Sequence, residues 1–353
     1  MGKHYTKTLA AALCLLSAAT VSNAQDIHFS QFYENAILRN PGLTGIFSGD
    51  YKGGVNYRSQ WGQISVPFTT MLASAEMRKV VNEETGDCVS FGLTATYDKA
   101  GSINFNSLQI YPAIAYNKAL EDAHGTFLTL GFAGGYIQRT TDPSKMTFSS
   151  QYVGGEWSGS NASGETINFN SVQHFDLGAG VSLNSSIGDK NNVNYYVGAS
   201  AFHILRPKNA FNKTDAFTRL SMKWSGNLGV KAQFTNQFGL VVHANYTNQQ
   251  PYEEMIVGGL LSYRTVDQNA KPFTFYIGSF YRFGDAIIPT VKMDYKMCSV
   301  TVSYDMNNSN LKTASNGLGG FEISLYARGY FTKESIVDMI KCPRFESLTN
   351  YMN

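Results

Sequence analysis

The sequence predicts an all-β fold, namely a transmembrane antiparallel β-barrel of about 14 strands. Three observations support this prediction: an export signal at the N-terminus, a composition rich in aromatic residues, and segments in which apolar and polar residues alternate. Aromatic residues make up 13% of the chain and charged residues only 15%, against roughly 25% charged residues in an average soluble domain.

The export signal has the usual three parts. Lys3 and Lys7 form a short basic region, residues 9–19 are apolar, and Ser22-Asn23-Ala24 gives the small-x-small pattern of a cleavage site. We therefore predict a signal peptide over residues 1–24. Beyond it no run approaches the ~18 consecutive apolar residues of a membrane helix. The chain is then either a large secreted β-protein or an outer-membrane barrel, and its net charge of +2 argues against a nucleic-acid partner.

Alternation with a period of two predicts the strands, because a strand between lipid and a polar interior changes environment at every residue. Residues 88–97 and 172–184 show the pattern most clearly. Their lengths approach the ~9–11 residues of a tilted spanning strand. The fourteen predicted strands are 51–58, 67–77, 88–97, 107–118, 125–137, 172–184, 193–204, 223–234, 238–247, 254–264, 273–282, 287–294, 297–305 and 320–330.

Loop lengths give an independent indication, because outer-membrane barrels have short periplasmic turns and long outer loops. The long connections 138–171, 205–222 and 306–319 all follow odd-numbered strands, whereas the short connections 235–237 and 295–296 follow even-numbered ones. A soluble sandwich has no reason to obey this parity. We expect both termini in the periplasm, with an N-terminal periplasmic or plug segment over 25–50, the barrel over 51–330 and a periplasmic tail over 331–353.

Aromatic residues near the predicted strand ends suit interfacial girdles, although Tyr favours any sheet. These residues are Tyr57, Tyr97, Tyr116, Tyr195, Trp224, Tyr246, Tyr263, Tyr304 and Tyr330.

Several motifs resemble the PorP/SprF family of Bacteroidetes outer-membrane proteins, which is associated with type IX secretion and gliding motility. They include DIHFSQFYENAILRNPGLTG at 26–45, NYRSQWGQI at 56–64, YDKAGSINF at 97–105, FDLGAGVSLN at 175–184, YYVGASAFHILRP at 195–207, VSYDMNNSNL at 302–311, GGFEISLYARGY at 319–330 and CPRF at 342–345. The resemblance implies a barrel that assists export of a cargo protein. It also implies surface anchoring of an adhesin with a type B C-terminal domain, and contact with periplasmic secretion components. The alternative function is a transport barrel for a small solute.

The predicted inward face carries charges of both signs. These can line a water channel or pair across the lumen, and we favour pairing because a selective channel would show one dominant sign. The residues are Lys52, Arg58, Glu76, Asp176, Lys231, His243, Arg282, Lys292, Glu322 and Arg328. Segment 26–45 is either a periplasmic docking element, an inward plug or a helical turn that closes the barrel floor.

No enzymatic chemistry is indicated. Strand histidines lie near serines, but nothing marks a nucleophile with its base and its orienting group. The sequence contains no Gly-rich phosphate loop and no HExxH zinc motif. We expect no catalytic residue, no cofactor and no metal.

Two predicted outer loops carry the candidate partner-binding residues, because loops on a rigid scaffold vary at little cost to the core. Aromatic residues in 138–171 and basic and aromatic residues in 205–222 form this set. It comprises Tyr152, Trp157, Arg206, Lys208, Phe211, Lys213, Phe217 and Arg219. Basic charge near the outer leaflet suits lipopolysaccharide phosphates as well as it suits cargo, and both interpretations stand.

Three cysteines follow the signal: Cys88, Cys298 and Cys342. The predicted topology brings all three to the periplasmic rim, and an oxidising compartment favours one bridge. We predict Cys298 with Cys342, because the tail can move to reach a partner. Bridging needs Cα atoms within roughly 7 Å, and three unbridged thiols are the alternative.

Overall fold

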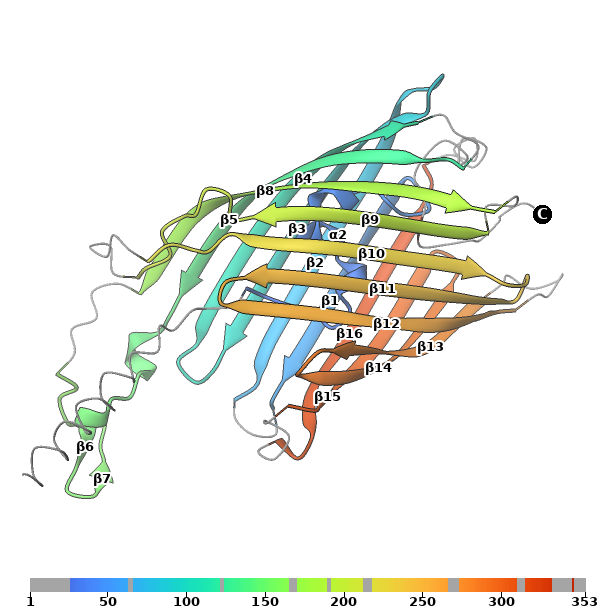
Figure 1. Cartoon of the computed structure of the whole chain (residues 1–353). Helices are drawn as coiled ribbons and strands as arrows, with labels where there is room; N and C mark the ends of the chain where they lie inside the picture. Colours follow the sequence, from blue (N-terminus) through green and yellow to red (C-terminus); the bar gives the residue numbers. More distant parts are fainter. Residues whose placement is uncertain are drawn as a thin grey trace, which may run out of the picture.

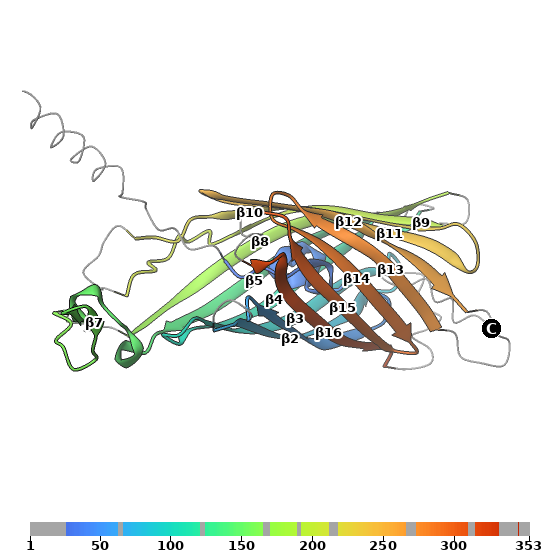
Figure 2. The same ribbon diagram turned by 90° about the horizontal axis from the view of Figure 1, so that it is seen from below.

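The computed structural model describes residues 26–62, 66–120, 124–164, 170–188, 192–211, 218–265, 273–309, 315–331 and 345. Fourteen antiparallel strands close into a barrel in which β1 pairs with both β2 and β16. Figure 1 shows the strands tilted around a common axis, and Figure 2 shows the same barrel from below. The predicted all-β barrel of about 14 strands is therefore confirmed.

The strands lie close to their predicted positions, and 273–282 matches at both ends. Those from β2 to β8 are longer than predicted, because their ladders continue into the connections. The barrel strands are β1 (Tyr51–Gln60), β2 (Phe68–Asn82), β3 (Asp87–Ala100), β4 (Phe105–Ala119), β5 (Phe127–Thr140), β8 (Ser171–Ile187), β9 (Val193–Phe202), β10 (Lys223–Gln233), β11 (Phe238–Gln249), β12 (Tyr252–Arg264), β13 (Phe273–Arg282), β14 (Ala286–Tyr295), β15 (Cys298–Asn307) and β16 (Leu318–Gly329).

Side chains alternate between the outside and the inside of the wall, as the period of two requires. Strand β14 shows this over its whole length. Its outward residues are apolar, and its inward residues include Thr290, Lys292 and Asp294, all three buried. An apolar outer wall around a polar interior is the arrangement that a bilayer demands of a barrel.

The two ends of the barrel differ. The longest connections, 141–170, 203–222 and 308–317, all lie at one end, which we call the outer end. The opposite, inner end carries the turns 188–192, 234–237 and 296–297. Long loop 141–170 also holds a two-stranded hairpin that the sequence did not predict, with β6 (Tyr152–Val153) and β7 (Glu156–Trp157), preceded by η3 (Pro143–Lys145) and η4 (Ser149–Gln151).

Residues 26–50 occupy the barrel interior (Figures 1 and 2). They contain η1 (Phe32–Glu34), α2 (Ala36–Arg39) and η2 (Pro41–Leu43), and every one of these three turns buries side chains. We call residues 26–50 the lumen segment. None of the helices in the described residues has the length and apolar character of a membrane span.

The main apolar core lies inside the barrel rather than between two layers. Phe32, Tyr33 and Leu43 of the lumen segment pack in it with inward side chains of β9 and β11 to β14, including Phe280. The lumen is thus filled by the protein's own chain.

Glycines on two strands let the lumen segment approach the wall. A Cβ at Gly131 of β5 would lie 2.2 Å from the carbonyl oxygen of Pro41, and one at Gly180 of β8 would lie 1.9 Å from the side chain of Asn40. Real Cβ contacts are never this short. The glycine richness of these strands therefore has a packing cause at these two positions, because η2 rests directly on the backbone of the wall.

Candidate functional site

A buried charge network fixes the lumen segment to the first and last strands. The carboxylate of Glu322 on β16 accepts hydrogen bonds from the backbone N–H of Ser30, at 2.8 Å, and of Gln31, at 3.0 Å. The Gln31 amide in turn donates to the backbone oxygens of Thr301 and Glu322 and to Ser303 Oγ. The segment is therefore tied to main-chain and side-chain atoms of β15 and β16.

Two arginines and two carboxylates form the centre of this network. Arg58 on β1 pairs with Asp305 and Glu322, each at 2.8 Å, and Arg282 on β13 pairs with Asp305 at 3.0 Å. All four side chains are at most 4% exposed. Both arginines also donate to Ser30 Oγ. Buried charges are tolerated only when they are paired and hydrogen-bonded, and here each of the four charges has a partner of opposite sign.

Nearer the inner end, the lumen segment makes a second set of contacts. The Glu34 carboxylate accepts from Lys292 Nζ at 2.7 Å and from Thr301 Oγ1 at 3.2 Å. The Tyr33 ring stacks on His243, with ring centroids 5.0 Å apart, and on Phe280, at 5.1 Å. Polar and aromatic contacts therefore hold η1 against one side of the barrel.

From η1 the segment crosses to the opposite wall. The Asn40 amide donates to the backbone oxygen of Val181 on β8 and to Asn227 on β10. Ser182 donates to the backbone oxygen of Gly42 at 2.6 Å. The lumen segment thus reaches from one side of the barrel wall to the other.

At the outer end, Asp26 is held between the side chains of Lys223 and His203. Its carboxylate lies 2.5 Å from Lys223 Nζ and 3.6 Å from His203 Nε2, while His203 Nδ1 lies 2.8 Å from Asp176. Burial alone would raise the pKa of Asp26, but Lys223 and His203 hold it well below its usual value. Burial alone would lower the pKa of His203, but its two carboxylate neighbours raise it instead. We call Asp26, His203 and Lys223 the outer latch.

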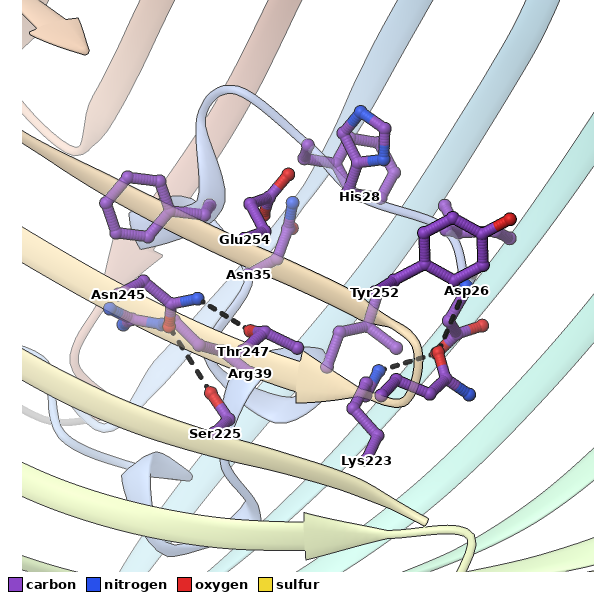
Figure 3. Close-up of a pocket in the computed structure, with 15 residues that line it drawn as sticks. Asp26, His28, Asn35, Arg39, Lys223, Ser225, Asn245, Thr247, Tyr252 and Glu254 are labelled. Atoms are coloured by element: carbon purple, nitrogen blue, oxygen red, sulfur yellow. Dashed lines mark hydrogen bonds and ion pairs between the residues drawn. The ribbon is translucent and has the colours of Figure 1, made fainter. Parts of the chain in front are cut away.

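A pocket of about 80 Å³ opens between the lumen segment and strands β10 to β12 (Figure 3). Its wall is mainly polar on the strand side, where Asn245 bonds Thr247, and mixed on the segment side, where Phe29 and Phe32 meet Asn35 and Arg39.

The predicted inward residues all point into the lumen. Lys52, Arg58, Glu76, Asp176, Lys231, His243, Arg282, Lys292 and Glu322 are buried, and Arg328 is partly buried, 3.0 Å from Asp294. Their partners include the lumen segment as well as other strands: the Glu76 carboxylate, for example, accepts from the backbone N–H of Gly45. The sequence reasoning missed Asp305, although the period of two in β15 marks it as inward.

The predicted loop residues divide into two groups. Tyr152 and Trp157 lie cross-strand from each other on the exposed hairpin β6–β7. Lys208 and Arg219 form an isolated bridge across loop 203–222, and Arg219 donates to the backbone oxygen of Arg206. Phe211 packs edge-on against Phe105, at 6.1 Å. Lys213 and Phe217 lie outside the described residues.

The C-terminal region contributes one described residue to the lumen. Phe345 of the predicted periplasmic tail is buried, with its ring 4.5 Å from Tyr196 and 5.4 Å from His243. Cys342 lies outside the described residues, so its bridge to Cys298 stays a prediction. Within the part of the chain that the structure describes, no cluster of three or more His, Cys, Asp or Glu side chains could hold a metal ion.

Comparison with known proteins identifies a family. The family model described as "Type IX secretion system membrane protein PorP/SprF" matches residues 21–326. No curated protein sequence matches the chain.

Solved barrel structures resemble the chain only distantly. The Ralstonia pickettii toluene transporter TbuX, 10% identical, aligns over 83% of this chain and 93% of its own, with a TM-score of 0.47. A Pseudomonas aeruginosa FadL homologue, 11% identical, aligns over 82% of this chain and 92% of its own, with a TM-score of 0.48. Nothing about the substrate of either protein transfers at this similarity.

Proposed function

The chain belongs to the PorP/SprF family of type IX secretion system membrane proteins, and from this premise we propose that it assists export of a cargo protein and anchors it at the cell surface. The cargo is a surface protein or adhesin with a type B C-terminal domain, and its docking surface is formed by the outer loops. Family and fold are those of an outer-membrane secretion or transport component rather than of an enzyme.

The observation that supports anchoring over general transport is the filled lumen. The lumen segment crosses the interior and is tied to the wall by the buried Arg58–Glu322 pair and by Glu34–Lys292. A barrel whose interior is packed with its own chain offers no wide aqueous path. The outer end, where the longest loops gather, offers a surface for a protein partner.

Residues on those loops suit a protein partner. Tyr152 and Trp157 are exposed on the hairpin, and Arg206 and Arg219 lie on the neighbouring loop. Tyr, Trp and Arg dominate the energy of protein interfaces. Contact of the same basic residues with lipopolysaccharide phosphates is compatible with this proposal, because the aromatic hairpin is a separate surface.

Loop replacement tests the proposal. Residues 142–169 are replaced by a short Gly-Ser turn, which keeps the Thr141–Asn170 hydrogen bond that closes the ladder. The matched control replaces 309–316, which carries no aromatic residue and also lies at the outer end. We expect the first variant to release a surface protein into the medium and the control to retain it. Equal retention in both variants would show that the hairpin loop is not the anchor.

The alternative is a transport barrel for a small solute, and the pocket in Figure 3 is the feature that favours it. Planar-bilayer conductance separates the two functions. Anchoring predicts silence from the purified wild-type barrel, whereas a steady open pore would favour transport.

A further inference from the structure

The path of the lumen segment places its first described residue at the opposite end of the barrel from the start of β1. Asp26 bonds Lys223, the first residue of β10, and its backbone N–H donates to Gln249, the last residue of β11. Both residues border connections at the outer end. Tyr51, by contrast, begins β1 at the inner end, where it pairs with Gly329.

The contacts between these points follow the barrel axis in order. Ser30 meets Arg58 and Asp305, which lie two residues from the outer ends of β1 and β15. Glu34 meets Lys292 and, through its backbone oxygen, Lys52, both on the inner halves of their strands. The chain therefore runs from the outer mouth to the inner half of the barrel between residues 26 and 34.

From this path we propose that the lumen segment is a strut threaded through the barrel from the cell surface, so that Asp26 lies at the outer mouth beside the long loops. From the sequence alone, this region was either a periplasmic docking element, an inward plug or a helical turn that closes the barrel floor. Contacts at three positions along the barrel axis hold the strut: the outer latch, the Ser30–Glu322 network and the Glu34–Lys292 pair.

The barrel wall around the strut is closed. All fourteen barrel strands are paired on both sides, so the strut has no lateral exit. Because Ser30 and Gln31 bond Glu322 on β16 while Arg58 of β1 pairs with the same carboxylate, the strut bridges the seam between the first and last strands. The closed wall and the seam contacts therefore hold the strut inside the folded barrel.

A cysteine-bearing insertion tests the location of the outer end. Gly-Cys-Gly is inserted between Gln25 and Asp26 of the full-length protein, in a Cys298→Ser, Cys342→Ser background. Cys88 stays, because its side chain is fully buried. Intact cells are then treated with a membrane-impermeant maleimide. Trp157→Cys at the outer end and Asn236→Cys at the inner end are the references, and a Gly-Ser-Gly insertion is the blank.

We expect the insertion to label on intact cells to the same extent as Trp157→Cys, and Asn236→Cys to label only after permeabilisation. An insertion that labels together with Asn236→Cys, or that fails to label even in permeabilised cells, would overturn the proposal. The insertion is compared with both references, so the result shows at which end of the barrel Asp26 lies for either orientation of the barrel in the membrane. Surface-protein retention is not measured, so this test is independent of the proposed anchoring function.

Discussion

Replacement of Glu322 by Gln removes a buried charge that accepts two backbone hydrogen bonds from the lumen segment. The carboxylate accepts four hydrogen bonds: from the backbone N–H of Ser30 and of Gln31, from Asn56 Nδ2 at 2.9 Å and from Arg58 at 2.8 Å. A glutamine offers one oxygen to these four donors, and its own amide group would face some of them. The substitution therefore leaves buried donors unpaired as well as removing an ionic partner.

The size of the effect follows from burial. Removing one partner of a buried ion pair costs about 3–5 kcal/mol, because the other charge stays desolvated. Arg58 keeps Asp305 at 2.8 Å, so we expect a loss near the lower limit, about 3 kcal/mol. The free energy of unfolding is measured by urea titration in detergent micelles, and loosening of the lumen segment is measured as new conductance in planar bilayers.

Glu253→Gln is the matched control. Glu253 is exposed and accepts a hydrogen bond from the partly buried Asn248, so its replacement should change stability by less than about 0.5 kcal/mol. The reasoning is refuted if Glu322→Gln and Glu253→Gln unfold at the same urea concentration and both stay electrically silent. That result would mean that the charge network does not hold the segment.

Three further predictions concern the orientation of the barrel, the seat of Phe345 and the outer latch. Trp157→Cys should react with an impermeant thiol reagent on intact cells and Asn236→Cys only after permeabilisation; labelling of position 236 alone would reverse the assigned orientation. Phe345→Ala should speed proteolysis of the tail in membranes. Gly229→Ala should do the same, because its new Cβ would crowd the Tyr196 ring and lie 2.8 Å from the Phe345 ring that packs on it. Unchanged rates in both variants would show that Phe345 is not held in the lumen. The pKa of His203 is raised in the folded state. The stability that protonated His203 contributes is therefore fully present below its unfolded-state pKa of ~6.5 and is lost as the pH rises through its folded-state pKa. The stability difference between wild type and His203→Gln should therefore shrink with rising pH, and a constant difference would contradict the ion pair.

The strands were predictable from the sequence because their cause is local. Lipid on one side and a polar interior on the other force alternation at every residue, and β14 carries that pattern from Ala286 to Tyr295. The same pattern identified Arg58 and Glu322 as inward. It gave no partner for either residue, because alternation assigns a face of the wall and not a contact across the lumen.

The lumen segment shows what only the tertiary structure decided. Its sequence suited a docking element, a plug or a floor turn equally well, since it has no period and no strand of its own. Its position depends on contacts such as Ser324 with Gln31, which are 293 residues apart in the chain. The same holds for the glycine at 131, which reads as an ordinary strand residue until η2 is seen resting on it. The alternation of apolar and polar residues in the sequence determined the strands of the barrel wall. The position of the lumen segment was determined by long-range pairing of buried charges and by close packing of η2 on the backbone at wall glycines.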